Sequence, residues 1–474
     1  MSDIASSSWW TSRAAQRLHL LVAVAAVLFL LPLAREEDLT WLAGLLLVLP
    51  ALLLTFLRWP SGALWILISF SAMPVFFIEI FGWKARPEHF AAGIVLLAVG
   101  VSFLTYKKSM KFHTLDYWIL AFIAVNFVSS TFGSSAPSST LRWALQNTLA
   151  ILPYFLVRQL IPDSQTLEKA FRILLAVGLA ESLYGIFCAL SHYAFGTQAG
   201  MSIDQYLFSV AAPYGSMYEP NLFGAYTACC AILFLATFLA GRYRNASGIG
   251  FLIASLAAVL SYSRAALLSF IVVCIWVCWK NRHSWFAGRT RLFGPVFVFA
   301  IACLLAVSTA GDVLRERFSD LYYGGARDET AMVRVLILQD ALQEIPSHPW
   351  LGTGTASFNL TFDWTRYIPE WASEKTWIGN APIRILHDTG VIGLVVFFGF
   401  FILVWRKARP MLKGAQTRHG MLLGLVGGAL LYGVSFQFTD GTILAFFWVH
   451  LGFLASAVIL NNANAPSTVA PSIH

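Results

Sequence analysis

Long apolar stretches separated by short polar segments run through almost the whole chain. A helix needs about 20 apolar residues to cross a bilayer core, so each stretch of that length predicts a transmembrane helix. Polar Arg142, Gln146 and Asn147 interrupt the start of one stretch, and residues 261–264 separate two others. The pattern predicts an all-α polytopic membrane protein with about 14 spans, near residues 18–34, 41–57, 62–82, 88–105, 115–132, 141–157, 170–193, 220–240, 247–262, 265–281, 291–310, 383–405, 421–437 and 442–460.

The composition agrees with this prediction. Of the 474 residues 58% are apolar and 12% are charged, against roughly 25% charged residues in soluble domains. So few charges exclude a soluble enzyme, a nucleic-acid-binding domain and a disordered protein. The six cysteines lie in apolar stretches without histidine pairing, so neither a disulfide framework nor a zinc site is predicted.

Basic residues predict how the chain is oriented in the membrane. If both termini are cytoplasmic, the cytoplasmic segments hold 20 of the 32 Lys and Arg residues, and seven of the other 12 fall in residues 311–384. This asymmetry is typical of a multi-pass protein whose basic loops remain inside. Residues 1–34 resemble a signal peptide, and we interpret them as a retained first span.

The spans divide the chain into four parts. We expect transmembrane helices 1–11 in residues 1–310, a periplasmic loop in 311–382, helices 12–14 in 383–460 and a cytoplasmic tail in 461–474. A loop of this length is usually functional or disordered, and its tryptophans (Trp350, Trp364, Trp371 and Trp377) argue against disorder.

Residues 330–345 in that loop have helical spacing of apolar side chains, which predicts an amphipathic helix along the membrane surface. The apolar face consists of Val335, Leu338, Leu342 and Ile345.

Arginines gather at the predicted outer face. Arg264 separates two spans, and an arginine at such a place usually pairs with an acid or marks a binding path. Because guanidinium groups bind phosphate oxygens bidentately, several arginines there predict a phosphate or pyrophosphate site. The alternative is that they snorkel to lipid headgroups or pair with loop acids. The loop arginines are Arg315, Arg317, Arg327 and Arg334.

Two histidines near this face, His348 and His387, are candidate general bases because an imidazole titrates near neutral pH. The alternative is a structural hydrogen-bonding role, which is the more common one for a lone histidine in a loop. The sequence has no metal-ligand spacing and no phosphate-binding glycine loop, so we expect no metal and no cofactor.

Four short motifs, in this order, resemble those of the O-antigen ligase and polymerase superfamily of bacterial inner-membrane glycosyltransferases. Residues 219–224 (Glu-Pro-Asn-Leu-Phe-Gly) begin a span, and residues 263–267 (Ser-Arg-Ala-Ala-Leu) lie between two spans. Arg334 is followed by a His-Pro-Trp-Leu-Gly-Thr-Gly turn at 348–354, and Asn380 is followed by Asp388 and the glycines of 390–393.

The resemblance implies a fold of the GT-C glycosyltransferase type and an undecaprenyl-pyrophosphate-linked oligosaccharide as donor. It implies that Arg264 and Arg334, with Arg317 and Arg327 as further candidates, bind the pyrophosphate. Asn380 and Glu219 lie at motif positions expected to contact substrate. Other polysaccharide-assembly proteins are potential partners, and no nucleic-acid partner is expected.

The sequence departs from this family at one position. The family's ligases have a His-Asn pair whose histidine is regarded as the base, and here Gly379 precedes Asn380. His348, His387 and Asp388 are competing substitutes. We therefore expect a polymerase of exopolysaccharide or O-antigen repeat units, with a ligase, a transporter or flippase, and a non-catalytic family member as alternatives.

Overall fold

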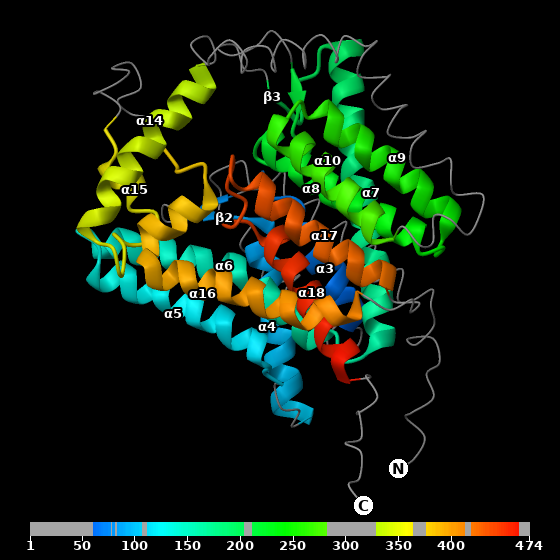
Figure 1. The fold of residues 1–474 in the computed structure, drawn as a ribbon, viewed down its shortest axis with the longest axis horizontal. Coiled ribbons are helices and arrows are strands. Elements are labelled where there is room, and N and C mark those ends of the chain that lie inside the picture. The colour runs from blue at the N-terminus through cyan, green and yellow to red at the C-terminus, as the bar shows by residue number, and fades with distance from the viewer. Residues whose placement is uncertain are drawn as a thin grey trace, which may run out of the picture.

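The computed structural model describes residues 60–76, 78–80, 83–106, 111–202, 211–281, 329–363, 376–412 and 419–463. Within these ranges the chain forms α-helices and two short hairpins (Figure 1). The helices are α3 (Pro60–Ser71), α4 (Pro87–Tyr106), α5 (Thr114–Phe132), α6 (Pro137–Leu160), α7 (Ser164–Phe195), α8 (Pro220–Leu239), α9 (Arg244–Leu260), α10 (Arg264–Lys280), α14 (Glu329–Glu344), α15 (Phe358–Thr361), α16 (Ala381–Met411), α17 (His419–Ser435) and α18 (Ala445–Ala463).

The hairpins are antiparallel and short. One pairs β1 (Ile78–Ile80) with β2 (Trp83–Ala85), and the other pairs β3 (Met201–Ser202) with β4 (Ala212–Pro213).

Five of the described helices are long and apolar enough to cross a membrane: α5, α7, α8, α16 and α18. The predicted all-α membrane fold is confirmed. The predicted spans near 18–34, 41–57 and 291–310 lie outside the described residues, so the number of spans stays a prediction.

The third predicted span, 62–82, is wrong in its extent. α3 ends at Ser71, and a turn leads into the β1–β2 hairpin. Pro74 explains this end, because a proline lacks the backbone donor and disfavours helix at the residue before it.

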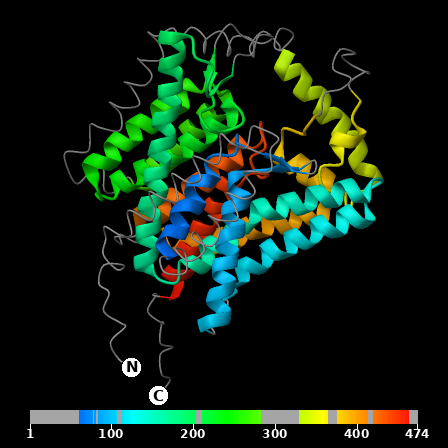
Figure 2. The ribbon, with the colours of Figure 1, turned by 180° about the vertical axis from the view of Figure 1, so that it is seen from behind.

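The helices form two groups that meet at α17 and α18 (Figures 1 and 2). α8 lies at the centre of the first group, where α7, α9, α10 and α17 contact it, and its residues 222–237 are all buried. A helix that is apolar on every side suits such a position. α5, α6 and α16 form the second group, and α18 packs on α6.

α14 and α15 cover the beginning of α16 beside the second group (Figures 1 and 2). α14 confirms the predicted helix at 330–345 almost to the residue, followed by a 3-10 turn, η2 (Ile345–Ser347). Ile337 and Ala341 are buried against the protein, whereas Val335 and Leu342 of the predicted apolar face are about half exposed, so that the contact of this face with the membrane surface stays a prediction. Ile337 and Ala341 pack on Phe358 and Ile378, so α14 has a second apolar face that contacts the protein.

α16 is broken at Gly390, whose φ of 64° and ψ of −170° are not helical. The turn before α15 satisfies the backbone groups that the break frees: Val391 N–H donates to the Pro349 carbonyl at 2.9 Å, and Gly354 N–H donates to the Asp388 carbonyl at 3.0 Å. Gly352 and Gly354 have positive φ, which allows this close approach. The glycine-rich turn at 348–354 is thus a structural partner of the break in α16.

We expect Gly390→Ala to lower the free energy of unfolding by about 1–3 kcal/mol or more, because only glycine adopts this backbone conformation readily. A Cβ there would also meet the Trp350 carbonyl. Thermal unfolding of the purified protein in detergent measures the change. Gly433→Ala is the control, since Gly433 is helical, exposed and has no atom near its Cβ position. Equal melting temperatures of the two variants would contradict this account of the break.

Candidate functional site

A cavity of about 1400 Å³ opens at the end of the bundle where α8, α10, α16 and α18 begin. We call this the cavity end. Segments distant in sequence line the cavity: α6, the turn before α8, the α9–α10 junction, α14, residues 376–380, the start of α16 and the turn at 436–444. Four of the predicted site residues line it together, namely Arg264, Arg334, Glu219 and Asn380.

Arg264 is positioned by the short junction between α9 and α10. Ser263 is the N-cap of α10, and its Oγ accepts from Ala266 N–H at 3.3 Å while donating to Asn221 Oδ1 at 2.9 Å. Arg264 is therefore the first residue of α10, where the helix dipole adds to its own charge. A cationic side chain at a helix N-terminus suits an anionic ligand.

Arg334 reaches the cavity from α14. The contacts of Ile337 and Ala341 with the segment that carries Ile378 hold this helix in place. Val333, Val335 and Leu338 also line the cavity, so this wall presents apolar surface beside the guanidinium group. α14 thus offers one cation in an otherwise apolar wall.

Glu219 and Asn380 are the N-cap residues of two helices that begin at the cavity, and both contact the turn between α17 and α18. Glu219 is the N-cap residue of α8, and its Oε1 accepts from Thr439 Oγ1 at 2.7 Å. Asn380 is the N-cap of α16: its Oδ1 accepts from Ile383 N–H at 2.9 Å, and its Nδ2 donates to the Gln437 carbonyl at 2.9 Å. Since both ends of the Asn380 amide bind backbone, the geometry gives this residue a capping role.

The structure adds Arg86, which the sequence did not single out. Arg86 follows β2 and is buried; its Nε lies 2.9 Å from Glu88 Oε1, and it donates to the Ile443 carbonyl at 3.1 Å. Its guanidinium lies 6.0 Å from the centre of the Tyr218 ring, and both residues line the cavity. Partial burial raises the pKa of the Tyr218 phenol, although the charge of Arg86 acts against this, so the phenol stays a hydrogen-bond donor. Arg86 lies at the edge of an apolar stretch, and this position was the sequence signal from which a binding role could have been inferred.

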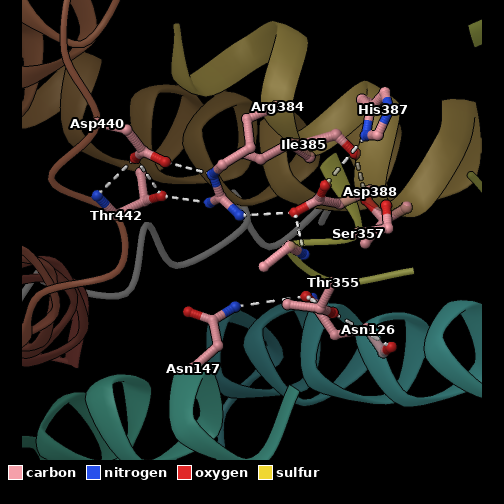
Figure 3. A network of polar contacts seen from close by, with 12 residues as sticks. Asn126, Asn147, Thr355, Ser357, Arg384, Ile385, His387, Asp388, Asp440 and Thr442 are labelled. Atoms are coloured by element: carbon pink, nitrogen blue, oxygen red, sulfur yellow. Dashed lines mark hydrogen bonds and ion pairs between the residues drawn. The ribbon is translucent and has the colours of Figure 1, made fainter. Parts of the chain in front are cut away.

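Arg384 is the second arginine that the sequence did not single out. It is 4% exposed and lines the cavity from the first turns of α16. It pairs with Asp388 at 3.0 Å and with Asp440, and it donates to Thr442 Oγ1 at 2.6 Å (Figure 3). Asp440 in turn accepts from the Thr442 backbone N–H at 2.8 Å. The pairing ties the start of α16 to the turn between α17 and α18.

His387 and Asp388 extend this network away from the cavity. Asp388 accepts from Ala356 N–H at 2.9 Å, and its other oxygen lies 3.2 Å from His387 Nδ1 (Figure 3). His387 Nε2 lies 2.9 Å from Glu344 Oε2 at the end of α14. Both residues are 1% exposed, and neither lines the cavity. Their contacts join α16 to α14 and to the turn at 348–354.

His348 is exposed, and it too is absent from the cavity lining. Its Nδ1 lies 2.9 Å from the neighbouring Ser347 Oγ, and its carbonyl accepts from Gly352 N–H at 2.9 Å. The structure therefore does not bring the three predicted acid–base candidates to the cavity with the arginines.

Gly379 does line the cavity. A Cβ at this position would have only the Phe438 carbonyl oxygen nearby, at 4.0 Å. Space for a side chain therefore exists where the family's ligases have histidine.

Two predicted pyrophosphate ligands, Arg317 and Arg327, lie outside the described residues. Within the ranges that the structure does describe, no group of three or more His, Cys, Asp or Glu side chains is arranged to hold a metal ion. The expectation of a metal-independent site stays a prediction.

The family model for the O-antigen ligase matches residues 249–398. This confirms the predicted resemblance to the O-antigen ligase superfamily over the part of the chain that contains Arg264, Arg334, Gly379 and Arg384. No curated protein matches the chain.

We expect Arg384→Met to lower the free energy of unfolding by about 3–5 kcal/mol, because it leaves two buried carboxylates without their cation. Unfolding in detergent, followed by temperature or denaturant, measures this loss. Arg172→Met is the control: Arg172 pairs with Glu168 at 3.5 Å and its side chain is 57% exposed, so we expect a loss below about 1 kcal/mol. Similar losses in both variants would contradict the structural role of Arg384.

Proposed function

We propose that this protein is a glycosyltransferase of the bacterial inner membrane that acts at the periplasmic face on glycans linked to undecaprenyl pyrophosphate. Its product is a polymer of repeat units, an exopolysaccharide or an O-antigen. The observation that carries this proposal is the gathering of Arg264 and Arg334 at one cavity, within the region that matches the family. Arg86 and Arg384 bring two more guanidinium groups to the same cavity.

The charges along the bundle support the orientation. The end of the bundle opposite the cavity holds the last residues of α6 and the first residues of α7, α9 and α17. The chain segments at that end are rich in basic residues. Such loops face the cytoplasm in multi-pass proteins. The cavity end then faces the periplasm, where lipid-linked repeat units are presented.

The arginines act on the leaving group. Arg264 and Arg334 bind the pyrophosphate of the donor, and Arg86 is a third cation for the same anion. As the acceptor hydroxyl attacks the anomeric carbon, the bond from that carbon to the phosphate oxygen breaks, and its electron pair remains on undecaprenyl pyrophosphate. Fixed guanidinium groups stabilise the charge that develops there.

Glu219 is our choice for the group that takes the proton of the acceptor hydroxyl. It lines the cavity, and its described hydrogen bond comes from one hydroxyl, that of Thr439. Asp440 also lines the cavity but is paired with Arg384. We assign His387 and Asp388 to positioning, because neither side chain lines the cavity and their contacts join helices and hold Arg384.

A ligase is the second candidate function. The matching family model is that of the O-antigen ligase, and Gly379 leaves space where ligases have their histidine. The absent imidazole favours the polymerase. Both reactions use the same donor, so the arginines serve either one.

We expect Arg264→Ala to reduce polymer formation by about 100-fold to 1000-fold, the typical effect of removing one donor to a developing negative charge. Glycans extracted from cells that carry the variant should be single repeat units on the lipid carrier. Arg142→Ala is the control, because Arg142 is exposed at the same end of the bundle and does not line the cavity.

Normal polymer in cells with Arg264→Ala, together with normal protein levels in the membrane, would overturn the proposed site. Full-length polymer left on the carrier would instead establish a ligase. Repeat units retained on the cytoplasmic side would indicate a flippase.

We expect Glu219→Gln to reduce the rate of polymerisation by about 100-fold to 10,000-fold, since a general base contributes that much. The amide keeps the size of the side chain and its hydrogen-bonding capacity toward Thr439. Rates are measured with the purified protein and lipid-linked repeat units. Thr439→Val serves as the control for the hydrogen bond alone and should have a much smaller effect. A fully active Glu219→Gln variant would exclude Glu219 as the base.

A further inference from the structure

The beginning of α6 presents a second, uncharged face to the cavity. Trp143, Gln146 and Asn147 all line it. Their spacing of three and four residues places them on one side of the helix. Gln146 and Asn147 interrupt an otherwise apolar span, and polar residues inside membrane segments usually mark a binding path.

Asn147 has a buried acceptor that lacks a partner. The residue is 6% exposed, its Nδ2 donates to Asn126 Oδ1 at 3.3 Å, and its Oδ1 has no hydrogen bond (Figure 3). Asn126 fixes this orientation, because its own Nδ2 donates to the Phe122 carbonyl and its Oδ1 also accepts from Thr355. Asn147 must therefore present Nδ2 to Asn126 and leave Oδ1 for another donor. A buried acceptor left unpaired costs about 1–3 kcal/mol, so Asn147 Oδ1 favours a donor that the described residues do not supply.

Two indoles adjoin these amides. Trp143 and Trp377 lie edge to face, with ring centres 5.0 Å apart and planes at 87°. Each indole restrains the orientation of the other. In an edge-to-face pair at least one face of each ring is not covered by the partner ring. Sugar rings pack their C–H faces on such surfaces, since the aromatic face carries partial negative charge. Trp377 belongs to the segment 376–380, so the pair also links α6 to the start of α16.

We propose that Trp143, Gln146, Asn147 and Trp377 form a glycan subsite that binds the neutral sugar rings of the acceptor. The set contains two stacking surfaces and two amides, and none of its four side chains is charged. The arginines that suit the pyrophosphate come from other elements. The identity of the sugars as acceptor rests on the proposed function, whereas the subsite itself rests on the geometry of α6.

Glycan binding by the purified full-length protein in nanodiscs tests this subsite. The probe is the oligosaccharide released by mild acid from the lipid-linked repeat units of the producing cells, with undecaprenyl pyrophosphate as a separate probe. We expect Trp143→Ala and Gln146→Ala each to weaken binding of the oligosaccharide at least tenfold and to leave binding of undecaprenyl pyrophosphate unchanged. Trp143→Phe should retain most of the affinity, and Arg142→Ala on the same helix is the control.

Arg264→Ala should give the reverse pattern, with oligosaccharide binding kept and undecaprenyl pyrophosphate binding lost. The subsite is overturned if the wild-type protein does not bind the oligosaccharide, or if Trp143→Ala and Gln146→Ala bind it as the wild type does. It is also overturned if Arg264→Ala loses the oligosaccharide as completely as they do. Failure of the wild type to bind undecaprenyl pyrophosphate would instead contradict the proposed function, and oligosaccharide binding would still decide the subsite.

Discussion

Arg384 carries a permanent charge into a buried position, and burial of such a charge costs several kcal/mol unless carboxylates and hydrogen bonds surround it. One carboxylate comes from Asp388 a helical turn further on, and the other comes from Asp440 in the turn between α17 and α18. That turn also carries Thr439, which donates to Glu219. Neutralising one guanidinium therefore fixes the relative positions of α16, the 436–444 turn and the start of α8, which together form much of the cavity wall.

The same requirement extends to the outer helix. Asp388 binds the turn before α15 through Ala356 N–H, and its neighbour His387 contacts Glu344 on α14. The break at Gly390 allows that turn to approach α16 closely enough to share backbone hydrogen bonds. α14 is thereby held where Arg334 reaches the cavity. The motifs that resemble the ligase family thus contain two kinds of residue, those that line the cavity and those that hold the lining in place.

The sequence predicted most of the described helices because length and apolarity alone determine whether a segment can cross a membrane. It failed at α3, where Pro74 ends the helix within a stretch that is apolar on average. The second face of α14, which packs on Phe358 and Ile378, was not predicted, because no local periodicity reveals this tertiary contact.

Part of the candidate site could also be predicted from the sequence. Arg264 and Arg334 stand out in the sequence, since each is a charge at the edge of an apolar segment or within the one long loop. Arg86 and Asp440 do not stand out in this way. Arg86 lies near the Tyr218 ring and Asp440 pairs with Arg384, and each of these contacts joins segments far apart in the chain. The sequence could not place the two histidines, because a side chain that titrates near neutral pH is chemically suited to act as a base, but packing decides whether it reaches the cavity. His387 is buried between two helices, and His348 is exposed beside Ser347.

A glycosyl transfer brings together an anion that gains charge and a neutral hydroxyl, and these two reactants favour different surroundings. Guanidinium groups lower the energy of the first and contribute little to the second, whereas indole and amide groups suit the second. The cavity provides both kinds of surface from different elements, arginines from α10 and α14 and uncharged groups from α6. Glu219 precedes α8 by one residue, and Asn221 two residues later accepts from Ser263, the cap before Arg264. The proposed base and the first arginine therefore belong to one hydrogen-bonded framework, so that a shift of the α9–α10 junction would displace both together.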